Sequence, residues 1–178
     1  MKTSFYSIEE LAEIGLKSYG NNVLISRHCC IYGANNISIG NNVRIDDFCI
    51  LSGSITLGDN IHISAYCALY GAKGIEFKNN SGMSPRSTIF SAMDDFSGDY
   101  LIGPIHDKSK TNVTGGKVII EEYVQIGAHC VVFPNLTIGK GCVIGAMGLV
   151  NKSLSEWGIY IGQPVRLLKE RKRGLLNL

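Results

Sequence analysis

The amino-acid sequence predicts an all-β fold, a three-sided column of short strands in which the chain turns a corner every six residues. The evidence is a bulky apolar side chain at every sixth position over two long stretches. Such a period fits neither a helix, with about 3.6 residues per turn, nor a single strand, with a period of about 2. It is typical of a solenoid, in which one inward side chain per face stacks on its equivalents in neighbouring turns. The two series are Ile39, Ile45, Leu51, Leu57, Ile63 and Leu69, and Ile120, Ile126, Val132, Ile138, Ile144 and Val150.

A second level of repetition supports this prediction. Residues 25–51 align with residues 63–89, and the alignment brings Tyr32-Gly-Ala onto Tyr70-Gly-Ala. Each block has two extra residues after this triplet, which we expect to form a bulge at a corner of the column. Gly and Asn follow many of the register residues, and both tolerate the positive φ that tight corners need.

Four features divide the chain into segments, all within a single domain. Ser7 and Glu10 form a capping-box pattern, so residues 1–20 are expected to contain a short helix within 7–18. Coils then occupy residues 21–90 and 118–162. Residues 91–117 have no period, and a long insertion of this kind in a compact protein is usually functional or disordered. Gly162-Gln163-Pro164 ends the coils, and residues 163–178 are predicted to form a short basic C-terminal helix.

The composition narrows the range of partners and compartments. The chain has 178 residues and a formal net charge of +2, which is too weak to indicate nucleic acid as a partner. No apolar run reaches the roughly 18 residues of a membrane span, and the N-terminus lacks a signal-peptide pattern. We therefore expect a cytoplasmic protein. Five of the six cysteines lie four residues after a register residue, where a small, reduced side chain packs inside the coil; these are Cys29, Cys49, Cys67, Cys130 and Cys142.

Particular hexads and the C-terminal segment resemble a known family. Ile126-Gly-Ala-His-Cys-Val, Ile138-Gly-Lys-Gly-Cys-Val and the tail Gly162-Gln-Pro-Val-Arg are similar to sequences of the hexapeptide-repeat acyltransferases, in their sugar acetyltransferase branch. The resemblance covers nearly the whole chain. It implies a left-handed parallel β-helix, acyl-CoA as co-substrate, and a homotrimer with active sites between neighbouring columns. The 91–117 loop would then reach across to a neighbour.

The candidate catalytic residues follow from a departure from that family. Galactoside and maltose acetyltransferases read roughly Ile-Tyr-Thr-Ala-Thr-His where this chain has Ile89-Phe-Ser-Ala-Met-Asp94, so Asp94, followed by Asp95, replaces the histidine base. A hydroxyl acceptor needs such a base, whereas a neutral amine attacks with its own lone pair. The chain is similar here to N-acyltransferases of dTDP-amino-sugar pathways, in which a Ser and an Asp at these places are implicated. Ser84 would supply the hydroxyl.

The same resemblance implies where coenzyme A binds. Backbone groups of Gly127-Ala128 and Gly145-Ala146 would contact the pantetheine arm, and the turn at Gln163-Pro164 would close over it. Basic side chains near the C-terminus suit its phosphates; the candidates are Lys152, Arg166 and Lys169. Alternatively, the small residues serve only the turns, and the basic residues form a solvated helix face.

The leading hypothesis is a CoA-dependent N-acyltransferase that acts on the amino group of a nucleotide-linked amino sugar in surface-polysaccharide synthesis. One alternative is a sugar O-acetyltransferase with His106 or an aspartate as base, and another is a non-catalytic scaffold. Asp94-Asp95 could also be a simple turn. His28, His62 and His129 are expected to point outward, and their spacing does not favour a metal site.

Overall fold

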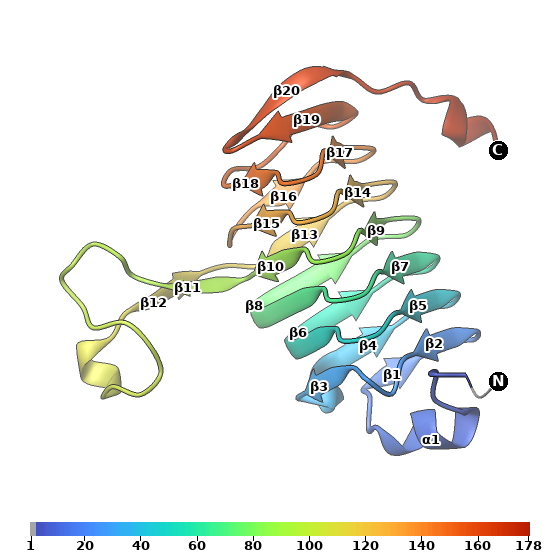
Figure 1. The fold of residues 1–178 in the computed structure, drawn as a ribbon, viewed down its shortest axis with the longest axis horizontal. Helices are drawn as coiled ribbons and strands as arrows, with labels where there is room; N and C mark the ends of the chain where they lie inside the picture. The colour runs from blue at the N-terminus through green and yellow to red at the C-terminus, as the bar shows by residue number, and fades with distance from the viewer. Residues whose placement is uncertain (1–2) are drawn as a thin grey trace.

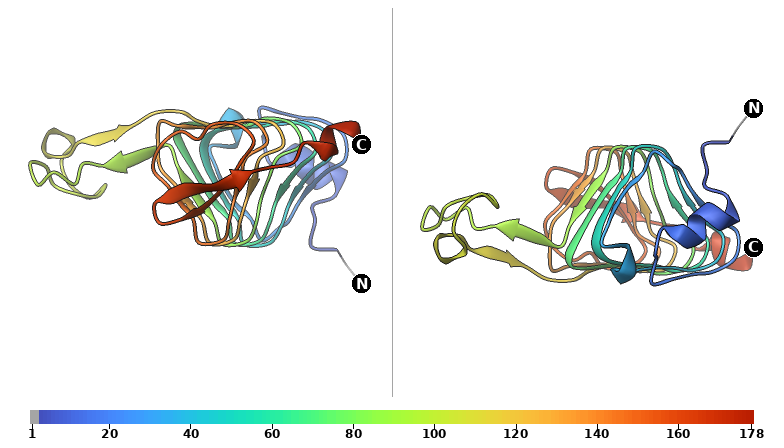
Figure 2. Two further views of the ribbon diagram at one scale, coloured as in Figure 1. Left: turned by 90° about the horizontal axis from the view of Figure 1, so that it is seen from above. Right: turned by 90° about the horizontal axis from the view of Figure 1, so that it is seen from below.

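A computed structural model, which describes residues 3–178, shows a column of short parallel strands with one projecting arm (Figure 1). Viewed along its axis, the column is three-sided (Figure 2). It has about seven turns, so the predicted parallel β-helix is confirmed. Residues 1 and 2 of the predicted N-terminal segment lie outside the described part of the chain.

Two sheets make up the three faces of the column. The longer β6 and β8 continue around one corner, so a single sheet covers two faces. Its strands, in order, are β1 (Ser18–Tyr19), β4 (Ile37–Ile39), β6 (Ile50–Leu57), β8 (Ala68–Phe77), β10 (Thr88–Phe90), β15 (Val131–Val132) and β18 (Leu149–Val150), with β3 (Cys30–Tyr32), β13 (Val118–Ile120) and β16 (Thr137–Ile138) attached beside them. The third face consists of β2 (Val23–Ile25), β5 (Val43–Ile45), β7 (Ile61–Ile63), β9 (Gly82–Met83), β14 (Gln125–Ile126), β17 (Val143–Ile144), β19 (Gly158–Gly162) and β20 (Val165–Glu170).

The core is formed by the register residues that the six-residue period predicts. Successive register residues fall on successive faces of the column. Each one therefore pairs with the register residue three places further along its series, which lies on the same face in the next turn. This arrangement produces three inward stacks, almost all fully buried. The stacks are Ile31, Leu51, Leu69, Ile89, Val132 and Val150; Ile39, Leu57, Phe77, Ile120 and Ile138; and Ile25, Ile45, Ile63, Met83, Ile126, Ile144 and Tyr160.

The predicted extra residues occur where the sequence places them. In the first block they form a short 3-10 helix, Ala34–Asn36, after Gly33 in the left-handed region at φ 72°. In the second they shift the register between β6 and β8, so that the single residue between Gly53 and Ile55 faces the three residues between Gly71 and Ile75. Both are bulges at the same corner of the column.

The corners are closed by residues in the left-handed region and by ladders of side-chain hydrogen bonds. At one corner Asn22, Asn42, Asn60 and Asn80 all have φ between 54° and 59°. Each amide donates to the next, with N–O distances of 2.9, 3.1 and 2.9 Å. At another corner the buried thiols of Cys49 and Cys130 donate to carbonyls of the next turn. All six cysteines are free, and four of the five that were predicted to pack inside the coil are buried there.

The N-terminal helix is confirmed, although it is shorter than predicted. Helix α1 covers Ile8–Glu13, and Ser7 and Glu10 form the predicted capping box. Strand β1 then starts the first coil at Ser18, before the predicted boundary. None of the helices in residues 3–178 is long and apolar enough to cross a membrane.

The predicted C-terminal helix is wrong. Residues Val165–Glu170 form β20, which pairs antiparallel with β19 around Gln163-Pro164. The pairing satisfies backbone groups at the open end of the column, and Val165 is buried there. Arg171 holds the strand by donating to the carbonyls of Tyr123 and Gly141 at 2.7 and 3.0 Å. This tertiary context overrides the helical propensity of the basic run. Only a 3-10 helix, Gly174–Asn177, follows it.

The predicted aperiodic insertion is an ordered arm that leaves the column after β10. Its two sides pair as an antiparallel ribbon of β11 (Ala92–Asp94) and β12 (Val113–Gly115), with a 3-10 helix at Lys108–Lys110 near its far end. The buried Ser91 ties the base of the arm to the column. Its hydroxyl donates to the Tyr70 carbonyl at 3.0 Å and accepts from the Lys73 backbone N–H at 2.8 Å.

Candidate active site

One corner of the column stacks Ser84, Gly127 and Gly145 on three successive turns, and we call these residues the Ser84 edge. The Ser84 N–H donates to the carbonyl of Ile126, the Gly127 N–H to Ile144, and the Gly145 N–H to Tyr160, each at 2.8 Å. Neighbouring strands lie about 4.8 Å apart, so these residues form a continuous line. The edge therefore places the candidate catalytic serine in line with two candidate coenzyme A contacts.

The glycines of this edge are required by the packing of the turns. A Cβ at Gly127 would lie 2.7 Å from the Ala146 backbone nitrogen, and one at Gly145 would lie 2.9 Å from the Ile161 side chain. Their identity is thus explained without a ligand. Without side chains at these two positions, and with only methyl groups at Ala128 and Ala146, the edge remains shallow enough for an extended ligand to approach the backbone.

The Ser84 edge continues into the basic C-terminal hairpin. Ile161 packs beside Gly145 and pairs with Arg166 across β19 and β20. Arg166 and Lys152 line one cavity of about 430 Å³, together with Ser153, Ser155 and Tyr160. The structure therefore brings two of the three predicted phosphate partners together.

The remaining predicted coenzyme A residues, Gln163, Pro164 and Lys169, do not line this cavity. The Gln163 amide donates to the Met147 carbonyl at 2.7 Å, which ties the turn at Gln163-Pro164 to the corner next to Ala146. Lys169 lies farther along β20, opposite Ile159, and is not among the residues that line the cavity.

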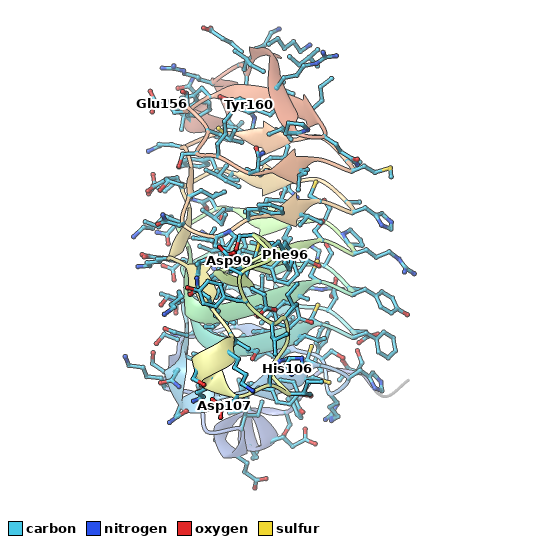
Figure 3. The ribbon with its side chains drawn as sticks, turned by 90° about the vertical axis from the view of Figure 1, so that its left-hand side faces the viewer. Phe96, Asp99, His106, Asp107, Glu156 and Tyr160 are labelled. Atoms are coloured by element: carbon cyan, nitrogen blue, oxygen red, sulfur yellow. The ribbon has the colours of Figure 1, made fainter. Side chains whose placement is uncertain are left out.

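Asp94 lies at the base of the arm between two cavities. One, of about 360 Å³, is shared with Gly103, His106 and Lys108; the other, of about 460 Å³, is shared with Phe133 and Asn135 of the column. The Asp94 carboxylate is half-buried and accepts a long hydrogen bond of 3.4 Å from the Gly103 N–H. The arm thus brings His106 to the same cavity as Asp94, and Figure 3 shows His106 near Asp107 on the arm. Both candidates remain available to a ligand.

Asp95 has a different role from its neighbour. Its carboxylate accepts from the Ser97 N–H and from the Asn112 amide, both at 2.8 Å. The hydrogen bond from the Ser97 N–H is the main reason that the pKa of Asp95 lies below its usual value, and hydrogen bonds from the Ser97 and Asn112 side chains lower it further. These bonds join the two sides of the arm. Asp95 is therefore the turn residue that the alternative interpretation describes, while Asp94 is not.

Ser84 and Asp94 lie at different corners of one chain. Ser84 precedes β10, and Asp94 belongs to the ribbon that leaves the column after β10 and extends away from it (Figure 1). Within one chain the two candidate catalytic groups are therefore separated by a face of the column.

The other histidines lie on the outer surface, as predicted. His62 faces Asp46, with 2.8 Å between Nε2 and the carboxylate, and His28 stacks on Phe48. His129 is an exposed corner residue at φ 57°. Across residues 3–178, no three or more His, Cys, Asp and Glu side chains gather in a way that could hold a metal ion.

One residue of the site was missed from the sequence. The Gln125 amide donates to the Ser84 hydroxyl at 3.1 Å. The six-residue period could have revealed this contact. Gln125 directly precedes the register residue Ile126, and Gly82 directly precedes the register residue Met83. If the arm is omitted from the chain, these two positions fall on the same face in neighbouring turns, next to Ser84.

Comparison with known proteins identifies close relatives. No profile of a protein family matches the chain. A dTDP-4-amino-4,6-dideoxy-D-glucose acyltransferase of Escherichia coli is 38% identical over 172 residues, which cover 95% of this chain and 90% of the relative. A GDP-perosamine N-acetyl transferase of Caulobacter crescentus is only 17% identical, with a TM-score of 0.63, and shares the fold.

The solved structures of AntD, an N-acyltransferase from Bacillus cereus, are more similar. They are 52% identical and superpose with a TM-score of 0.97, covering 99% of this chain and 94% of AntD in the complex with dTDP and 3-hydroxybutyryl-CoA. Another complex contains dTDP-4-amino-4,6-dideoxyglucose and coenzyme A. The AntD variants with solved structures include S84A, S84C, D94A and D94N.

Replacing Asp95 by Ala should open the arm without unfolding the column. The change removes the acceptor that joins Ser97 to Asn112. The lowered pKa of Asp95 shows that its ionised form stabilises the arm. This stabilisation is present above the pKa of a free aspartate and is lost as the pH falls through the lowered pKa of Asp95. Trypsin at neutral pH should cleave at Lys108 or Lys110 severalfold faster in Asp95→Ala than in wild type. The exposed Asp99 of the same arm provides the control Asp99→Ala, and equal cleavage of all three proteins would contradict this role.

Proposed function

The chain belongs to the acyltransferases that include the dTDP-4-amino-4,6-dideoxyglucose acyltransferases, and from this premise we propose that it transfers an acyl group from acyl-CoA to the amino group of dTDP-4-amino-4,6-dideoxyglucose. The observation that carries the proposal is the continuous Ser84 edge, which begins at a candidate catalytic hydroxyl and continues to the C-terminal hairpin, where Arg166 shares a cavity with Lys152. AntD, solved with this sugar nucleotide and with 3-hydroxybutyryl-CoA, suggests both substrates.

In the proposed complex, acyl-CoA lies along the Ser84 edge. Its phosphates contact Lys152 and Arg166, its pantetheine arm passes Gly145 and Gly127, and its thioester lies next to Ser84. Guanidinium and ammonium groups form charge-assisted hydrogen bonds with phosphates. The short side chains along the edge allow the backbone to hold the arm. This arrangement uses most of the residues that the resemblance implied, and it assigns Lys169 a peripheral position.

The proposed reaction needs the acid–base group that Asp94 supplies. The amine of the sugar attacks the thioester carbon, so a C–N bond forms, and the C–S bond then breaks to release coenzyme A. The Asp94 carboxylate orients the amine and takes the proton that leaves its nitrogen, and the departing sulfur takes up a proton. The Ser84 hydroxyl donates to the thioester oxygen as negative charge develops there. His106, in the cavity that Asp94 lines, is the second candidate for the proton route.

We also propose a homotrimer in which the arm of one copy brings Asp94 to the Ser84 edge of the next. The arm exposes large apolar side chains, with Phe96, Ile102 and Ile105 68, 52 and 87% exposed. The corner beside Ser84 exposes Phe48 and Tyr66, whose rings stack at 4.9 Å. Apolar surface of this kind is usually covered by a partner. The trimer would act in the cytoplasm and supply an acylated sugar nucleotide for surface polysaccharide.

A thiol-release assay tests the function. Wild-type protein with 3-hydroxybutyryl-CoA or acetyl-CoA should release thiol with dTDP-4-amino-4,6-dideoxyglucose and not with a dTDP-sugar that has a hydroxyl at that carbon. Asp94→Asn should lower kcat by roughly 100-fold or more, because it removes the proton acceptor. Asp99→Asn on the same arm is the control with unchanged kcat. Turnover of the hydroxyl sugar alone, or a fully active Asp94→Asn, would contradict the proposal.

The position of coenzyme A can be tested separately. Arg166→Ala and Lys152→Ala should each raise the KM for acyl-CoA by roughly tenfold, since each removes a charge-assisted contact to a phosphate. The KM for the sugar nucleotide should stay the same. Lys172→Ala, an exposed lysine beyond β20, serves as the control. An unchanged KM in both cavity variants would place the phosphates elsewhere.

A further inference from the structure

The Gln125 side chain lies in a depression that Gly82 creates in the third face. Gly82 pairs with His62 on one side and with Gln125 on the other. A Cβ at Gly82 would lie 2.9 Å from Gln125 Oε1 and 3.2 Å from the His62 carbonyl oxygen. Any side chain at position 82 would therefore occupy the space that the Gln125 amide now fills. Gly82 lets Gln125 lie flat across its strand toward Ser84.

The orientation of this amide fixes the direction of the Ser84 hydroxyl. Gln125 Nε2 is 3.2 Å from the Ile126 carbonyl oxygen and 3.1 Å from Ser84 Oγ. A carbonyl oxygen can only accept, so the nitrogen end of the amide must be the one that faces these two atoms. Ser84 Oγ then accepts from Gln125. Because a hydroxyl has a single hydrogen, that hydrogen is not used in this bond and can be donated to another acceptor.

The backbone of Ser84 is already held from two other directions. Its N–H donates to the Ile126 carbonyl at 2.8 Å, and its carbonyl accepts from the Cys67 thiol at 3.1 Å. The remaining freedom at this residue is rotation of its side chain and hydroxyl. Gln125 is exposed and restricts that rotation, which suits a role in orientation better than a role in the core.

We propose that Gln125 is a positioning residue that holds the Ser84 hydroxyl hydrogen outward, toward the reacting thioester, and that Gly82 is required because it leaves room for Gln125. This inference rests on the proposed role of Ser84 in acyl transfer. Orientation before the reaction lowers the cost of forming a hydrogen bond in the transition state. Gln125 itself contacts Ser84 and acts through it.

The kinetic test uses two substitutions that remove the same contact in different ways. Gln125→Met keeps the length of the side chain and removes the donor. Gly82→Ala leaves Gln125 intact but displaces its flexible end, and the backbone of Gly82 is not in the left-handed region. Each should lower kcat by roughly three- to tenfold, the effect of one hydrogen bond, with both KM values unchanged.

Two controls separate orientation from a general defect. Gly174→Ala, at a glycine whose added Cβ would meet nothing within 4 Å, should leave kcat and Tm unchanged. In a Ser84→Ala background, Gln125→Met and Gly82→Ala should cause no further loss, because the group they orient is absent. A fully active Gln125→Met, or an equal extra loss on Ser84→Ala, would overturn the inference while leaving the proposed function intact.

A second measurement does not depend on activity. In Ser84→Cys, the Gln125 amide would donate to the sulfur and favour the thiolate, so the pKa of this thiol should rise when Gln125→Met is added. The rate of alkylation by iodoacetamide against pH, followed by mass spectrometry of the peptide that contains residue 84, reports this shift. The exposed Cys30 is the internal control. Identical profiles in the single and double variants would overturn the inference, whether or not the protein releases thiol with the sugar nucleotide.

Discussion

The stacking of inward apolar side chains on three flat faces is the constraint on which the rest of this molecule depends. Each fully buried register residue contributes about 1.5–3 kcal/mol, and its neighbours above and below fix its register. The chain must then turn sharply between faces, so each corner takes residues in the left-handed region or residues without large side chains. The Ser84 edge is one result. Its glycines are required by the close approach of the next turn. The same close packing leaves a row of small residues that begins at Ser84 and continues toward Arg166.

The same geometry separates the candidate catalytic groups. A column of stacked turns offers edges and flat faces, but no enclosed cleft of its own. The chain departs from this pattern once, in the arm, which places Asp94 beyond the corner that follows β10 while Ser84 remains at the corner before it. An aspartate at a position where related sugar acetyltransferases have a histidine fits an amine acceptor, which needs orientation and a proton acceptor. The site is thus completed by a second copy of the chain in our proposal.

Much of this architecture was predictable because the period of six is a property of the backbone path. The register residues, the bulges after Gly33 and Gly71, and the thiols inside the coil all follow from it. The C-terminal strand was not predictable, because Val165–Glu170 pairs with β19 only at the open end of the column. The different roles of Asp94 and Asp95 depend on Asn112, on the far side of the arm, and the sequence does not show that pairing. Gln125 was missed because the arm separates it from Gly82 along the chain.

Mixed trimers of two nearly inactive variants test the division of the site between copies most directly. Ser84→Ala and Asp94→Asn should each keep only a small residual rate alone, since each lacks one group at every site. When the two are co-expressed in equal amounts, about a quarter of the sites would combine an intact Ser84 from one copy with an intact Asp94 from its neighbour. We therefore expect thiol release at about a quarter of the wild-type rate. A mixture that forms trimers and stays as inactive as its two components would contradict the account.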